Sequence, residues 1–152
     1  MADALSDLKP PLETILLVED ETLIRIGVAE YLRECGYRVR EANNAPEAMD
    51  ILTSRLPVDL VITDVYMPTR SGMDGLGLAR WIRSRHPDIE VLLTSGVVRP
   101  IDIPPDMRPI SPILVKPYTR RYLLDRIKDA LANRRPRGGK IGADERRQAA
   151  PR

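Results

Sequence analysis

The sequence predicts an α/β fold in which one parallel five-stranded sheet is doubly wound, with helices on both of its faces. Two observations support this prediction. Short aliphatic runs alternate along the chain with segments whose apolar residues recur at helical spacing. In addition, four of the aliphatic runs are followed directly by a chemically distinctive polar side chain. Strands that alternate with helices pair in parallel through right-handed crossovers, so these strand ends should meet at one edge of the sheet.

The first strand is expected at residues 12–18, a segment that ends in large aliphatic side chains suited to burial on both faces. A helix is expected at residues 21–35, because its apolar residues recur at helical spacing, and Gly36 follows as a typical helix terminator. Residues 37–42 are expected to form the second strand. These three segments make the first repeat of the alternating pattern.

The middle of the chain repeats the same alternation. A second helix is expected at residues 44–55, since Pro46 falls near its first turn, where proline is tolerated. The next segments are a buried strand at residues 58–63, a third helix at residues 74–85 and a fourth strand at residues 89–94. Together these segments supply two more strands and two more helices.

No regular helix is expected between the fourth and fifth strands. Residues 97–112 contain five prolines, and a proline inside a helix costs about 3 kcal/mol or more. The fourth helix of the pattern is therefore expected to be degraded or replaced by a proline-rich loop. A short fifth strand is expected at residues 113–115, and Thr119 is a suitable cap for the last helix.

One domain is expected at residues 13–133, between an N-terminal extension at residues 1–12 and a basic tail at residues 134–152. The net charge of +2 divides into +5 for this tail and −3 for the rest. The tail has little to bury and should be disordered, either simply solvated or in weak contact with nucleic acid or an acidic partner. The single cysteine and the lack of a membrane-length apolar run favour a cytoplasmic location.

The polar residues at the predicted strand ends are Glu19 and Asp20, Asp64, Ser95 and Lys116. Three carboxylates at one edge repel one another unless a cation intervenes, and oxygen ligands select Mg²⁺ or Mn²⁺. A carboxylate beside such a metal can attack a phosphoryl donor, while a lysine and a hydroxyl bind other phosphoryl oxygens. Any one of these residues alone is ordinarily a solvated turn residue, so the prediction depends on their joint occurrence.

Five segments resemble the receiver domain of two-component response regulators, in the order and at the spacing found in that family. They are LLVED at 16–20, ITDVYMP at 62–68, MDGL at 73–76, LLTSG at 92–96 and VKPY at 115–118. The resemblance covers about residues 13–133 and is to stand-alone, chemotaxis-regulator-like members. It implies a flavodoxin-like fold of five strand–helix units.

The resemblance also implies a metal site for Mg²⁺ or Mn²⁺. Asp64 would be both the phosphoacceptor and a metal ligand, and Asp20 would be a direct ligand. Glu19 would act largely through metal-bound water, and the backbone carbonyl of Tyr66 would complete the protein ligands.

Three more residues receive roles from the resemblance. Lys116 would sense the phosphoryl group, and Ser95 would be the hydroxyl that moves toward it as part of a switch. The second switch position, usually Tyr or Phe in the family, is Ile113 here, and an aliphatic side chain cannot make the same ring movement or hydrogen bond. The Lys116–Pro117 peptide is expected to be cis.

The function implied is that of a single-domain response regulator, which accepts a phosphoryl group from a histidine kinase or histidine phosphotransfer protein. Output would be a protein–protein interaction with an unknown target, and homodimerisation stays open. Fewer than twenty residues follow the last predicted helix, so no DNA-binding domain is expected. No membrane association is expected either, because no apolar run reaches the length of a membrane helix. Enzymatic activity would be limited to Mg²⁺-dependent self-phosphorylation and self-dephosphorylation.

Two alternatives remain. A phosphorylation-independent pseudo-receiver would bind partners without chemistry, but the complete set of acids argues against it. An Mg²⁺-dependent aspartyl-phosphate hydrolase would place a second aspartate two residues after the nucleophile, where this chain has Tyr66.

Overall fold

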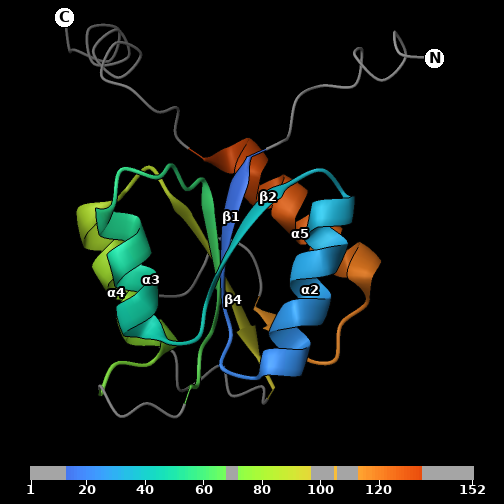
Figure 1. Ribbon diagram of the computed structural model, residues 1–152, viewed down its shortest axis with the longest axis horizontal. Coiled ribbons are helices and arrows are strands. Elements are labelled where there is room, and N and C mark those ends of the chain that lie inside the picture. Colours follow the sequence, from blue (N-terminus) through green and yellow to red (C-terminus); the bar gives the residue numbers. More distant parts are fainter. Residues whose placement is uncertain (1–12, 68–71, 97–104, 106–112, 135–152) are drawn as a thin grey trace, which may run out of the picture.

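The computed structural model describes residues 13–67, 72–96, 105 and 113–134. Within them, five strands form one parallel sheet in the order β2-β1-β3-β4-β5. Helices α3 and α4 lie on one face of this sheet, and α2 and α5 lie on the other (Figure 1). The predicted doubly wound α/β fold is therefore confirmed.

The strands are β1 (Thr14–Val18), β2 (Arg38–Ala42), β3 (Leu60–Asp64), β4 (Glu90–Ser95) and β5 (Leu114–Val115). The helices are α2 (Thr22–Glu34), α3 (Ala45–Thr53), α4 (Gly75–Arg85) and α5 (Arg120–Asn133).

Strand β1 lies between β2 and β3 in the sheet and is buried along its whole length. Because successive side chains of a strand point to opposite faces, it contributes to two cores. Ile15 and Leu17 pack in the core beneath α2 and α5, whereas Leu16 and Val18 pack in the core beneath α3 and α4. This arrangement explains the continuous aliphatic run from which the strand was predicted.

The helix ends follow local capping chemistry. Asn44 caps α3, Asp74 caps α4 and Thr119 caps α5, each accepting a hydrogen bond from a backbone N–H in the first turn. Gly36 follows α2 with a positive φ of 100°, a conformation that glycine adopts without a steric cost. At most of the helix and strand ends, the predicted boundary lies within about two residues of the observed one.

Arg134, where the basic tail was expected to begin, contacts the edge of the sheet at which the strands start. Its guanidinium lies 3.3 Å from a carboxylate oxygen of Glu13 and 3.2 Å from one of Asp59. The proline-rich residues 97–112, apart from residue 105, lie outside the described residues, as do residues 1–12 and 135–152. The predictions for those segments stay predictions. None of the helices in the described part of the chain is long and apolar enough to cross a membrane.

Candidate functional site

The sheet brings the predicted polar residues to one edge, where its parallel strands end. Glu19 directly follows β1 and Lys116 directly follows β5, while Asp64 and Ser95 are the last residues of β3 and β4. The pairing of neighbouring strands continues to these last residues. Asp64 lies beside Thr94 of the next strand, and the backbone N–H of Lys116 donates to the Ser95 carbonyl at 2.8 Å. Side chains far apart in the sequence are therefore held on adjacent strands.

Lys116 joins two of the carboxylates. Its Nζ donates to Glu19 Oε1 at 2.5 Å and to Asp64 Oδ2 at 3.0 Å. Glu19 is only 3% exposed and Asp64 only 8% exposed, so both negative charges need a partner. The predicted proximity of these three residues is confirmed, although their chemical roles stay predictions.

Burial and charge act on the pKa values of this cluster in opposite directions. For Lys116, burial alone lowers the pKa, but hydrogen bonds and attraction from Glu19 and Asp64 outweigh burial and raise it. For Glu19, burial raises the pKa by more than the hydrogen bonds from Lys116 and the Glu21 amide lower it. Lys116 therefore keeps its positive charge at neutral pH.

Asp20 completes a group of three acids that fits a divalent cation. Glu19, Asp20 and Asp64 each offer one carboxylate oxygen, and these oxygens lie within 4.8 Å of one another. Adjacent ligands of an octahedral Mg²⁺ lie about 3.0 Å apart and opposite ligands about 4.2 Å apart, so the three side chains would have to close around the ion to bind it directly. The oxygen-only donor set suits Mg²⁺ or Mn²⁺. Tyr66 lies two residues beyond Asp64 with an exposed side chain, and its carbonyl as a ligand stays a prediction.

The two predicted switch residues lie in different surroundings. Ser95 is 3% exposed at the end of β4. Ile113 is partly buried and packs against Val65, Ala79 and Leu93. The aliphatic side chain of Ile113 therefore joins an apolar cluster, at the switch position that an aromatic residue was expected to occupy in related proteins. The Lys116–Pro117 peptide is cis, as expected.

Gly75 belongs to the site, although the sequence indicated it only as part of a motif. A β-carbon on this residue would lie 1.6 Å from the backbone oxygen of Asp64 and 3.0 Å from Thr63 Oγ1. The start of α4 therefore lies directly against the backbone of Asp64, and only glycine allows that approach. Its place in the segment MDGL, just after the capping Asp74, was the only sequence signal.

Comparison with known proteins identifies the family. A model described as the response regulator receiver domain matches residues 15–128. The chain belongs to this family. Among solved structures, the response regulator TrrA from Thermotoga maritima, in complex with Mg²⁺-BeF, is 30% identical with a TM-score of 0.69, over 78% of this chain and 99% of that chain. A CheY-like receiver domain protein from Methanospirillum hungatei has the same fold, with a TM-score of 0.70 at 24% identity, over 80% of this chain and 94% of that chain.

Curated relatives share this receiver domain over part of their length. The sensor kinase CckA of Brucella abortus is 37% identical over 122 residues, which are 78% of this chain and 12% of that protein. The transcriptional regulatory protein PdtaR of Mycobacterium tuberculosis is 39% identical over 121 residues, which are 78% of this chain and 56% of that protein. The chain therefore spans about half of one relative and a small part of the other, so the likeness is one of receiver domains.

Proposed function

We propose that this receiver domain accepts a phosphoryl group on Asp64 from a histidine kinase or a histidine phosphotransfer protein, with Mg²⁺ or Mn²⁺ as cofactor. One observation supports the proposal above all. The Asp64 carboxylate lies within hydrogen-bond distance of Lys116 Nζ and within 4.8 Å of oxygens from Glu19 and Asp20. A nucleophile, a cation and a metal-ligand set thus converge at one strand end.

The chemistry follows from these positions. A carboxylate oxygen of Asp64 forms a bond to phosphorus while the bond from phosphorus to the donor's imidazole nitrogen breaks. A divalent metal at the three acids would neutralise the charge on the phosphoryl oxygens. The Lys116 ammonium, now 3.0 Å from Asp64 Oδ2, would turn to one phosphoryl oxygen, and the Ser95 hydroxyl would donate to another.

The output of the phosphorylated domain is proposed to be protein–protein interaction, with homodimerisation as one form. The chain would act as a signalling domain whose only catalysis is its own phosphorylation and dephosphorylation. Its match to a sensor kinase and a transcriptional regulatory protein supports a place in two-component signalling. The free Cys35 fits the reducing conditions of the cytoplasm.

Mass spectrometry after treatment with acetyl phosphate and Mg²⁺ tests the proposal. The wild-type chain should gain one phosphoryl group, and Asp64→Asn should gain none, because an amide is nearly isosteric with the carboxylate but is a poor nucleophile. Asp50→Asn on the exposed face of α3 is the matched control and should be labelled like the wild type.

The remaining outcomes separate the alternatives. Label retained by Asp64→Asn would place the acceptor elsewhere. A wild-type chain that takes up no label would support the phosphorylation-independent pseudo-receiver. Steady release of inorganic phosphate from a small phosphate ester would support the hydrolase.

A further inference from the structure

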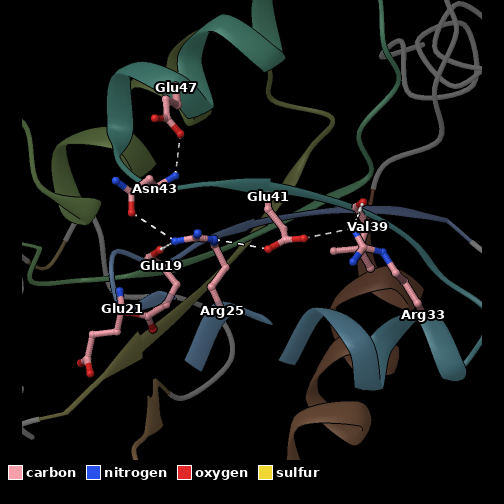
Figure 2. A network of polar contacts seen from close by, with 8 residues as sticks. All are labelled: Glu19, Glu21, Arg25, Arg33, Val39, Glu41, Asn43 and Glu47. Atoms are coloured by element: carbon pink, nitrogen blue, oxygen red, sulfur yellow. Dashed lines mark hydrogen bonds and ion pairs between the residues drawn. The ribbon is translucent and has the colours of Figure 1, made fainter. Parts of the chain in front are cut away.

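A network of charged and polar side chains lies beside Glu19, between α2, β2 and the turn that leads to α3 (Figure 2). Arg25 of α2 is at its centre. Its guanidinium donates to the Glu19 carbonyl at 2.8 Å, to Asn43 Oδ1 at 3.1 Å and to Glu41 Oε1 at 3.3 Å. One side chain therefore ties together three segments that end at or near the site.

The bond to the Glu19 carbonyl has the most direct consequence. That carbonyl belongs to the peptide group that joins Glu19 to Asp20, two of the three acids that fit a metal. A hydrogen bond to it restrains the plane of this peptide group and so the direction in which each carboxylate leaves the backbone. Arg25 acts on the acids through the backbone between them.

Arg25 also holds the turn from its other side. Its backbone N–H donates to the Glu21 carbonyl at 2.9 Å, which begins α2. The Glu21 amide in turn donates to Glu19 Oε2 at 3.2 Å. Asp20 therefore lies between two points held by the same residue. The cap residue of α2, Glu21, makes no side-chain capping hydrogen bond, so the contacts of Arg25 restrain this turn together with those that Ala42 and Lys116 make to Glu19.

The other end of the network is anchored independently. Glu41 receives Arg25 on one oxygen and Arg33 on the other, the latter at 3.2 Å. Arg33 also donates to the Val39 carbonyl at 2.9 Å. The backbone N–H of Asn43 donates to Glu47 Oε1 at 2.8 Å, at the start of α3. The acceptors of Arg25 are thus held in place by β2 and α3, as a rigid support requires.

A lysine could not make the same three contacts. The guanidinium presents its donors in a fixed planar fork, whereas an ammonium is a single point charge on a flexible stem. A basic side chain is also unfavourable near the start of a helix, where the helix dipole is positive. Arg25 is therefore better explained by its acceptors than by its place in α2.

We propose that Arg25 is a positioning residue for the metal ligands Glu19 and Asp20. The inference rests on the proposed function, because it assumes that these acids bind Mg²⁺. Mg²⁺ demands near-ideal octahedral geometry, so ligands that lose their orientation lose affinity. Removal of a residue that orients metal ligands typically weakens binding about 10-fold to 100-fold.

Calorimetric titration of the full chain with MgCl₂ tests the proposal. Arg25→Met keeps the apolar stem and removes the donors, and should raise the Kd for Mg²⁺ by about tenfold. Arg33→Met is the matched control, because it removes an arginine from the same helix and the same Glu41 without touching the Glu19 carbonyl. Its Kd should stay close to that of the wild type. At saturating Mg²⁺, labelling of Arg25→Met by acetyl phosphate should recover, because Asp64 and Lys116 are untouched.

Three results would overturn the proposal: an unchanged Kd in Arg25→Met, an equal loss in Arg33→Met, or a labelling defect that saturating Mg²⁺ does not repair. If circular dichroism shows that Arg25→Met does not fold, Arg25→Lys replaces it and should give an intermediate Kd, and a wild-type Kd would refute the proposal. A wild-type chain that neither binds Mg²⁺ nor takes up label would contradict the proposed function itself. Wild-type binding with no effect of Arg25 would contradict the positioning role alone.

Discussion

Of the five glycines whose surroundings the described residues define, Gly75 is the one at which an added methyl group should cost most stability. A β-carbon there would lie 1.6 Å from the backbone oxygen of Asp64 and 2.7 Å from its carbonyl carbon, whereas real β-carbons keep about 3.0 Å from other atoms. Both contacts are with backbone, so no change of rotamer relieves them. Gly75→Ala must separate α4 from β3 by about 1.4 Å. Overpacking of this kind costs roughly 3 kcal/mol, or about 10 °C in melting temperature for a domain of this size.

The same substitution should also impair phosphorylation. The displaced backbone belongs to Asp64, so its carboxylate would leave its place beside Lys116 Nζ. A misplacement of about 1 Å can lower the rate of an oriented reaction about 100-fold. Labelling with acetyl phosphate and Mg²⁺, followed over time by mass spectrometry, should slow by about that factor. Thermal unfolding followed by circular dichroism measures the loss of stability separately.

Gly77→Ala is the matched control within the same helix. Its β-carbon would meet only side-chain atoms, Met73 Cγ at 3.1 Å and Asp74 Oδ1 at 3.5 Å. Alanine is favoured over glycine in a helix by about 1 kcal/mol, so this variant should be at least as stable as the wild type and equally labelled. A Gly75→Ala chain that melts and labels like the wild type would refute the reasoning.

Four further predictions concern the metal, Arg134, the residues that follow it, and pH. Asp20→Ala should weaken Mg²⁺ binding and slow both labelling and self-dephosphorylation, because it removes one oxygen ligand; an unchanged calorimetric titration would exclude Asp20 from the site. Arg134→Ala should lower the melting temperature by a few degrees, because it removes two partly exposed ion pairs worth about 1 kcal/mol together. Removal of residues 135–152 should change the melting temperature by less than about one degree, and a larger drop would show that they dock. Burial, reinforced by the charge of Glu13, raises the pKa of Tyr37. The stability that this shift contributes is present below the unfolded pKa of about 10 and is lost as pH rises through the folded pKa. Tyr37→Phe should therefore lose less stability than the wild type between about pH 9 and pH 11 in urea unfolding, and identical pH dependence would contradict the assignment.

Most of the sheet could be predicted because its signals are local. The strand β1 is buried on both faces, so every residue from Ile15 to Val18 is aliphatic, and that run is visible without the structure. The cap Thr119 was visible for the same reason, since it bonds to a backbone N–H three residues away. The strand ends were predicted less accurately, because Asp64 was expected to follow β3 but pairs with β4 beside Thr94 and is the last strand residue.

The candidate site was predicted from the same local signals combined with one topological rule. Parallel strands end at a common edge, so acids, a hydroxyl and a lysine after four strands had to meet there. The rule says nothing of which groups bond to which. That Lys116 contacts both Glu19 and Asp64 depends on side chains 97 and 52 residues apart.

The alternation of segments and the identity of the acids at the strand ends are therefore properties of the sequence alone, because each depends on residues within a few positions of one another. The need for glycine at position 75, the three acceptors of Arg25 and the ion pairs of Arg134 appear only once the sheet and its helices are packed. Each of these depends on a close approach between separate elements, and the distance between two elements is set by everything that packs between them.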